Sequence, residues 1–304
     1  ELRLVGSEMC IRDSNKDNVF PILANGTFDD CQDIVKRGFS ERTFLKDNQY
    51  LLAINSINWV RIIGQICYYF YASLKINTLS KPLNFSVPTG NFGNVFACYA
   101  ASKMGMPLSK IIVAVNSNDI LDRFFRKNDY SKAKVNETIS PSMDISVASN
   151  FERLLYDFYL EGDAQLCSEL YSNFPNSKIE IDSNIWKKSS ELFISYSSDD
   201  KATYECMKHY FNNFNYVMDP HTAVAADAVK ELNNKLVGKT VILSTAHPAK
   251  FPSVLKNAGL NTSIPNKLSA VLNKKEVAKK LSSNDDSIFE FIKIVSKRNV
   301  SLGL

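Results

Sequence analysis

The sequence predicts an α/β fold: an open, doubly wound and mostly parallel sheet with helices on both faces. Strand-like apolar runs alternate with helical patterns over most of the 304 residues, as they do where helices connect parallel strands. The run Val241-Ile242-Leu243 is continuously apolar, which is typical of a strand buried on both faces. A chain of this length can bury a large core in one big domain or two smaller ones.

The amino-terminal part contains a short strand, a helix and then the longest helical pattern of the chain. VFPILAN (19–25) predicts the strand, and GTFDDCQDIVKRGF (26–39) predicts a helix with an acidic first turn. Residues 55–76 carry apolar side chains nearly all round, which is typical of a buried helix. Four polar residues nevertheless recur every three or four positions and form one polar line: Asn55, Asn58, Arg61 and Gln65.

From residue 83 the chain alternates between strands and helices. Strands are predicted at 83–89, 110–116 and 239–246, and helices at 95–105, 118–128, 219–235 and 249–259. Ser149 and Glu152 form a capping box before a helical pattern, and Asp219 with Pro220 begins the helix at 219–235. Residues 162–216 read as mostly helical with loops, and two lysine-rich amphipathic helices, about 273–282 and 285–297, end the chain.

Composition and charge exclude several classes of protein. The net charge of +4 comes from scattered lysines, so we expect no nucleic-acid partner. No apolar run is long enough to span a bilayer, and we expect no membrane partner. Six widely spaced cysteines without a Cys-x-x-Cys pattern predict free thiols in a reducing compartment, with the cytoplasm as the expected location. Three distant histidines make a metal site improbable.

The segment SVPTGNFGN (86–94) predicts a strand, a glycine turn and the start of a helix. Glycines leave room for a close approach of the backbone, and the free N–H groups and dipole of the next helix point at whatever occupies the turn. Such a turn suits a phosphate group, with Asn91 and Asn94 as side-chain donors. The alternative is a glycine turn used only for packing. Neither the Walker pattern nor G-x-G-x-x-G is present.

Two further features lie where ligands bind in such folds. In VILSTAHPAKF (241–251), Ser244, Thr245 and His247 follow a strand, and ligands of open α/β sheets bind at the carboxyl edge. The alternatives are that Ser244 caps the following helix and that His247 is a turn residue. In the polar line, Arg61 needs an anionic partner, since a buried unpaired charge is costly. That partner is either a carboxylate of the protein or an anionic substrate group.

Five blocks, in this order, resemble threonine synthase: NSINWVRIIGQICYYF, TGNFGN, SMDISVASNFERLL, DPHTAVA and STAHPAKF. The resemblance runs from about Gly26 to about Leu260. It implies the tryptophan-synthase-β-like fold (fold type II) of enzymes that use pyridoxal 5'-phosphate. It also implies conversion of O-phosphohomoserine and water to threonine and phosphate, that is, a phosphate-releasing carbon–oxygen lyase.

The resemblance also implies roles for individual residues. It assigns the cofactor phosphate to Gly90, Asn91, Phe92, Gly93 and Asn94, and it places the hydroxyl of Thr245 opposite the pyridine nitrogen, where it tunes the cofactor's electronics. It assigns the substrate phosphate to four residues of the block NSINWVRIIGQICYYF, namely Asn55, Ser56, Asn58 and Arg61.

One element of the family is not matched. Its Schiff-base lysine stands in a Phe-Lys-Asp motif well before the DDCQ block, and this chain begins close to DDCQ. Lys46 is the lysine of a similar Phe-Leu-Lys-Asp stretch, which comes after that block, and Lys250 belongs to a different family motif. We therefore expect a carboxyl-terminal portion without the N-terminal part and without a catalytic lysine, inactive by itself.

On this interpretation the chain has three parts. Residues 1–18 are an unmatched leader or junction, 19–80 the end of the small domain with a crossover helix, and 81–304 the large cofactor-binding domain with C-terminal helices. Alternative functions are another enzyme of the same fold, namely a serine/threonine dehydratase or a cysteine synthase, or a phosphate-ligand-binding fragment without catalysis. The sequence does not indicate an oligomeric state.

Overall fold

The computed structural model describes residues 19–25, 28–46, 49–52, 55–77, 81–174, 176–266, 269, 277–282 and 285–296. The chain divides into two compact units. Unit 1 comprises Glu1–Leu52 with Ser263–Leu304, and unit 2 comprises Ala53–Thr262. The division that the sequence suggests, at residues 18 and 80, remains a prediction, and the expected leader lies outside the described residues.

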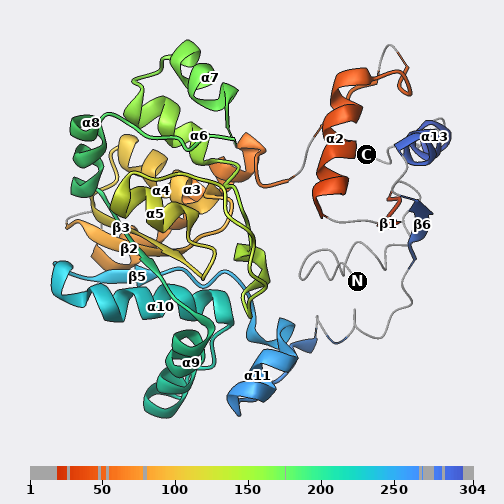
Figure 1. Cartoon of the computed structure of the whole chain (residues 1–304). Coiled ribbons are helices and arrows are strands. Elements are labelled where there is room, and N and C mark those ends of the chain that lie inside the picture. The colour runs from red at the N-terminus through yellow and green to blue at the C-terminus, as the bar shows by residue number, and fades with distance from the viewer. Residues whose placement is uncertain are drawn as a thin grey trace. The chain divides into compact units, whose positions relative to one another are not determined.

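The centre of unit 2 is a parallel four-stranded sheet (Figure 1). Its strands, in spatial order, are β4 (Phe193–Ser197), β3 (Leu108–Val115), β2 (Leu83–Pro88) and β5 (Thr240–Ile242). Every neighbouring pair is parallel, so each crossover must run over a face of the sheet. The predicted parallel, doubly wound arrangement is confirmed.

Helices cover both faces of this sheet (Figure 1). On one face α4 (Gly93–Lys103) and α5 (Ile120–Lys127) pack on the strands, and α3 (Trp59–Asn77) packs on α4. On the other face α10 (Pro220–Leu232) contacts the sheet, and α9 (Asp200–Phe214) packs on α10. The smaller helical elements are η1 (Pro141–Met143), α6 (Phe151–Leu154), the π-helical turn η2 (Leu155–Tyr159), α7 (Ala164–Ser172), α8 (Ser183–Lys188), η3 (Ser189–Glu191), η4 (Asn233–Lys235), η5 (Pro248–Lys250) and α11 (Pro252–Ala258).

The core of unit 2 lies between the sheet and the helices on its two faces. All of β2 is buried, as are the last five residues of β3, because strands covered on both faces lose contact with water. The hydroxyl of Ser86, buried in β2, donates a 2.7 Å hydrogen bond to the carbonyl of Ala225 in α10. This bond satisfies a polar group that would otherwise destabilise the core.

The described part of unit 1 includes a pair of strands and helices that contribute to a small core. β1 (Ile22–Asn25) pairs in parallel with β6 (Lys279–Ser282). Helices α2 (Phe28–Glu41) and α13 (Asp285–Val295) contribute to its core, in which the rings of Phe44 and Phe289 stack with centroids 4.5 Å apart.

Three secondary-structure predictions are wrong. Residues 279–282 form strand β6 rather than the end of a helix, because their backbone pairs with β1; residues 273–276 lie outside the described residues. Strand β4 lies within the stretch expected to be helices and loops, and its pairing with β3 overrides a weak local pattern. The capping box is absent: α6 begins after Asn150 without a side-chain cap.

Helix α3 is not buried on all sides. Its inner side carries Ile62 and Tyr69, both fully buried, whereas Val60 is 72% exposed and Tyr71 is 65% exposed. The apolar residues all round the helix therefore do not correspond to burial all round in this structure. Among the described residues, no helix is long and apolar enough to cross a membrane.

Cys67, Cys98 and Cys206 have free thiols that differ in burial. Cys67 is exposed, whereas Cys98 and Cys206 are buried. Burial raises the pKa of Cys98 well above its usual range and that of Cys206 to about 12, which keeps both as unreactive thiols.

We expect a thiol reagent at pH 8 to modify Cys67 first, and Cys98 and Cys206 only when the chain unfolds. Peptide mapping of a time course, with and without urea, measures this order. Labelling of Cys98 in the folded chain as fast as that of Cys67 would contradict the expectation.

Candidate functional site

A cavity of about 260 Å³ opens at the carboxyl end of the sheet in unit 2. It lies beyond the last residue of β2 and next to the segment that follows β5. This is the edge at which ligands of open α/β sheets bind. Its lining residues come from five segments of the chain: Ser56, Arg61, Gln65, Pro88 to Val95, Ser142, Met143, His221 and Thr245.

The turn between β2 and α4 forms one wall of this cavity. A Cβ atom on Gly90 would lie 2.6 Å from the carbonyl oxygen of Ser142, so only glycine fits at this position. Gly93 is different, because a Cβ atom there would make contacts of 3.5 Å or longer. The residue with a positive φ is Phe92 (φ 64°), which is rare for a bulky side chain.

Burial of its ring holds Phe92 in this unusual conformation. The ring is 1% exposed and packs against Phe151 and Phe125, with centroids 5.4 and 6.3 Å apart. Backbone outliers of this kind persist only when the surrounding structure fixes them, and they are frequent at functional sites.

The amino terminus of α4 faces the cavity without a side-chain cap. The first helical bond runs from the amide of Phe96 to the carbonyl of Phe92. The amides of Gly93, Asn94 and Val95 precede it, and a helix cannot satisfy the N–H groups of its own first turn. These donors and the positive end of the helix dipole suit an anion.

The two asparagines of the turn are held through their backbones. The carbonyl of Asn91 accepts bonds from Asn150, and the carbonyl of Asn94 accepts a 2.7 Å bond from the hydroxyl of Tyr69. Burial raises the pKa of Tyr69 well above its usual range, so this hydroxyl stays protonated and donates. Both asparagine residues line the cavity.

Two of the four residues of the polar line, Arg61 and Gln65, line the cavity, and so does Ser56. Within the described ranges Arg61 forms no ion pair. The side-chain oxygens of Asn55 and Asn58 accept bonds from the amides of Ile57 and Val60. Asn55 and Asn58 therefore shape the turn that precedes α3, and their contact with a substrate remains a prediction.

The segment after β5 brings one of its three polar candidates to the cavity. Thr245 is exposed and lines the cavity. Ser244 does not cap the next helical turn, since His247 is its N-cap residue and accepts a 3.2 Å bond from the amide of Ala249. His247 is therefore the residue that caps this short helix.

Asn150 joins two walls of the cavity, a role that sequence reasoning missed. This residue is fully buried, and its Nδ2 donates to the carbonyl of Ser56 (3.0 Å) and to the carbonyl of Asn91 (2.9 Å). Its Oδ1 accepts from Nε of Arg153, whose guanidinium also donates to the carbonyl of Ile57. These tertiary bonds, rather than a capping box, fix the start of α6.

The hydroxyl of Ser149, a residue of the predicted capping box, is buried and has no hydrogen-bond partner among the described residues.

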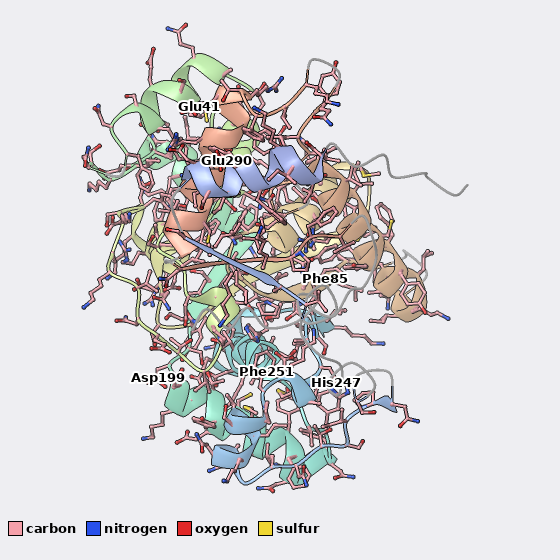
Figure 2. All side chains as sticks on the ribbon, turned by 90° about the vertical axis from the view of Figure 1, so that its right-hand side faces the viewer. Glu41, Phe85, Asp199, His247, Phe251 and Glu290 are labelled. Carbon is pink, nitrogen blue, oxygen red and sulfur yellow. The ribbon has the colours of Figure 1, made fainter. Side chains whose placement is uncertain are left out.

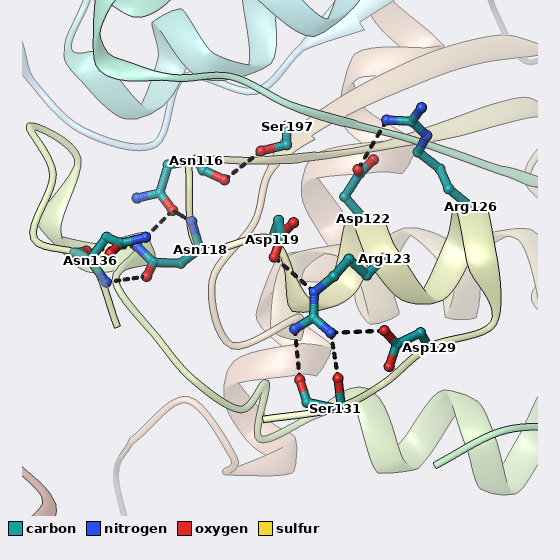
Figure 3. A network of polar contacts seen from close by, with 10 residues as sticks. All are labelled: Asn116, Asn118, Asp119, Asp122, Arg123, Arg126, Asp129, Ser131, Asn136 and Ser197. Carbon is teal, nitrogen blue, oxygen red and sulfur yellow. Dashed lines mark hydrogen bonds and ion pairs between the residues drawn. The ribbon is translucent and has the colours of Figure 1, made fainter. Parts of the chain in front are cut away.

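The loop that carries Ser142 and Met143 is held by a polar network beyond β3. Asp144 accepts bonds from the side chains of Asn116 (2.7 Å), Asn118 (2.9 Å) and Thr138 (2.7 Å). Figure 3 shows Asn116 and Asn118 bonded to each other, Asn118 bonded to Asn136, and Asn116 bonded to Ser197 of β4. The network therefore fixes this loop relative to the carboxyl ends of two strands.

A second cluster in Figure 3 holds the beginning of the same loop. Arg123 in α5 donates to Asp119, Asp129 and Ser131. The Arg123 side chain is 17% exposed, and those of Asp119 and Asp129 are 41% and 32% exposed. These charge-assisted bonds connect the loop to α5.

Neither candidate lysine is among the residues that line the cavity. Lys46 is exposed and belongs to unit 1, and Lys250 is half-buried in η5. The lining residues that the structure describes include no lysine. Likewise, the described residues contain no group of three or more His, Cys, Asp or Glu side chains that could hold a metal ion.

Comparison with known proteins gives a consistent result. Residues 222–292 match the family model described as threonine synthase, C-terminal. The chain resembles the carboxyl-terminal part of threonine synthases. The threonine synthase of Pseudomonas aeruginosa is 43% identical over 244 residues, which cover 80% of this chain and 52% of that protein. The threonine synthase of Saccharomyces cerevisiae is 40% identical over 262 residues and is covered to 51%.

Solved structures agree with these sequence comparisons. A threonine synthase from Brucella melitensis with bound pyridoxal phosphate has a TM-score of 0.87 and 35% identity, covering 95% of this chain and 62% of that one. The yeast threonine synthase structure has a TM-score of 0.83. The predicted fold type II architecture and the predicted resemblance are both confirmed. The chain spans about half the length of the curated relatives above.

Proposed function

We propose that this chain supplies the cofactor- and phosphate-binding part of a threonine synthase, which converts O-phosphohomoserine and water to threonine and phosphate. One observation carries the proposal. A single cavity combines the uncapped amino terminus of α4, the Gly90–Asn94 turn, Arg61 and Thr245. These groups suit two phosphate groups and an aromatic ring nitrogen. The resemblance to threonine synthases over 80% of the chain supports the same assignment.

The residues present fit pyridoxal 5'-phosphate as cofactor. The free amides of the first turn of α4 and the space against Gly90 form a phosphate cradle of backbone donors. Asn91 and Asn94 add amide groups beside it. When bound, the cofactor supplies an electron sink for reactions at an amino acid's α- and β-carbons.

We assign Thr245 to the ring nitrogen of the cofactor and Arg61 to the substrate. A neutral hydroxyl can accept or donate a hydrogen bond but does not impose a proton on the ring nitrogen, as a carboxylate would. Arg61, with Ser56 beside it, offers a charged fork suited to the phosphate of O-phosphohomoserine. The predicted contacts of Asn55 and Asn58 with that phosphate belong to the same proposal.

We further propose that these 304 residues bind the cofactor without covalent attachment and are inactive alone. The absence of lysine among the described residues that line the cavity supports this, because covalent attachment needs a positioned amine. The free thiols of the described cysteines fit a reducing compartment, and hence the cytoplasm.

The test combines three measurements on the purified chain. We expect calorimetry to show binding of pyridoxal 5'-phosphate, with pyridoxal lacking the phosphate binding at least about tenfold more weakly. Borohydride followed by intact mass measurement should leave the mass unchanged, and O-phosphohomoserine should release no phosphate.

Each of the three measurements can contradict a different part of the proposal. Equal binding of pyridoxal and its phosphate would contradict the phosphate cradle. A mass increase equal to the reduced cofactor would contradict non-covalent binding. Phosphate release by the isolated chain would contradict its inactivity and leave the reaction itself supported.

A further inference from the structure

His221 lies in the first turn of α10 and lines the cavity, although neither the sequence motifs nor the proposed function gives it a role. Its side chain is 5% exposed. Nδ1 lies 3.0 Å from Oδ1 of Asp219, and Nε2 lies 3.2 Å from the main-chain nitrogen of Ser142. The ring thus joins α10 to the loop that walls the cavity.

These partners select one tautomer of the ring. A main-chain N–H group can only donate, so the bond from Ser142 needs a lone pair on Nε2. An oxygen of Asp219 faces Nδ1 and accepts its proton. The geometry therefore selects the tautomer with the proton on Nδ1, since the Nε2 tautomer would break both bonds.

Neighbouring groups hold this pair rigidly. The same Asp219 caps α10 by accepting from the amides of His221 and Thr222, and it also accepts from the hydroxyl of Thr222. Phe251, which is labelled in Figure 2, packs against the imidazole with ring centroids 5.0 Å apart. Asp219 is fully buried, so the pair has little freedom to rearrange.

The backbone of Ser142 is the point where this rigidity reaches the site. Its carbonyl oxygen lies against Gly90, where an added Cβ would be 2.6 Å away. Its N–H group, on the other side of its Cα, is bound to His221. A shift of the Ser142 backbone would therefore change the space next to the first residue of the turn. The bond involves the main chain, so the Asp-His-Ser order does not make a hydrolase triad of the kind that activates a serine hydroxyl.

We propose that the Asp219–His221 pair is a positioning pair, which holds the backbone of Ser142 against the Gly90 turn and so sets the shape of the phosphate cradle. This role rests on the proposed cofactor site, but the bond and the tautomer do not. His221 touches neither cofactor nor substrate in this role and acts through the loop.

The experiment compares His221→Leu and His221→Gln with the unchanged chain. Leucine removes the acceptor, whereas glutamine can place an oxygen near the position of Nε2. His209→Gln, on the exposed surface of α9, is the matched control. Circular dichroism and thermal melting establish that each variant is folded.

Amide exchange and imidazole nitrogen spectra test the pair without any ligand. We expect the unchanged chain to show a proton on Nδ1, an unprotonated Nε2 and a protected Ser142 amide. Protection should be lost in His221→Leu and kept in His221→Gln and His209→Gln. A proton on Nε2, or unchanged protection in His221→Leu, would overturn the proposal.

Calorimetry with pyridoxal 5'-phosphate, and with inorganic phosphate as a second probe, tests the effect on the site. We expect about tenfold weaker binding in His221→Leu, about the effect of one unsatisfied buried donor, and near-normal binding in His221→Gln. Loss of Ser142 protection with unchanged binding would overturn the positioning role. If the chain without a substitution binds neither probe, the proposed function is contradicted. The exchange data would then still decide whether His221 holds the Ser142 amide.

Discussion

Gly90→Ala should destabilise unit 2 by about 1–3 kcal/mol and weaken the binding of pyridoxal 5'-phosphate about tenfold or more. The added Cβ would lie 2.6 Å from the carbonyl oxygen of Ser142 and 3.3 Å from Cα of Met143. Both are backbone atoms, so relief requires the turn and the loop to move apart. That movement widens the cradle at the position proposed for the phosphate.

Gly64→Ala is the matched control for this substitution. No atom lies within 4 Å of a Cβ built on Gly64, which is in the middle of α3. Alanine there should stabilise the helix by about 0.5–1 kcal/mol. Urea unfolding and calorimetry on both variants measure the two effects. Equal stability and equal affinity in the two variants would contradict the close approach at Gly90.

Asn150→Asp should cost about 3 kcal/mol of folding free energy at pH 8, the size expected for a buried charge without adequate partners. The substitution keeps the shape of the side chain but replaces Nδ2, which donates to the carbonyls of Ser56 and Asn91, by an oxygen that faces them. Nε of Arg153 remains as a partner for the other oxygen and offsets part of the cost. Binding of pyridoxal 5'-phosphate should weaken as well, because Asn150 joins two walls of the cavity.

The loss of stability in Asn150→Asp should depend on pH. Burial and the two facing carbonyl oxygens raise the pKa of the new carboxyl in the folded state above its unfolded value of about 3.9. The folded state then holds this proton more tightly than the unfolded state. Relative stability is therefore retained at low pH and lost as the pH rises through the folded pKa.

Urea unfolding at pH 5 and pH 8 measures this dependence. Asn184→Asp, at an exposed position in the first turn of α8, is the control and should change stability by less than about 0.5 kcal/mol at either pH. A stability of Asn150→Asp equal to that of the unchanged chain at pH 8 would contradict the bridging role.

The sequence predicted the sheet and the glycine turn before α4 because both are encoded locally. Apolar runs such as Val113 to Val115 and a glycine turn before a helix are visible within a few residues of one another. Arg61 was found from the spacing of polar residues along a helix and Thr245 from its place after a strand, and the family blocks added the role expected of each. Pattern and resemblance together thus identified residues from three of the five segments that line the cavity.

The remaining parts of the site depend on contacts between distant residues. Asn150 and His221 are polar residues at the starts of helices, where capping is the common local role, and only the tertiary structure shows that they bond to Ser56, Asn91 and Ser142. Strand β4 was missed for a similar reason, because its stability comes from pairing with β3. Phe92 rather than a glycine takes the left-handed conformation of the turn, which no local preference would suggest.

The conformation of Phe92 has a consequence for the thermodynamics of binding. A glycine at this position would leave the turn free to sample many shapes, and a ligand would have to restrict them at the moment of association. With the ring fixed in the aromatic core by Phe125 and Phe151, that loss of conformational entropy occurs when the chain folds. The turn is then rigid before any phosphate arrives, and its stiffness comes from apolar packing behind it rather than from the polar groups that face the cavity.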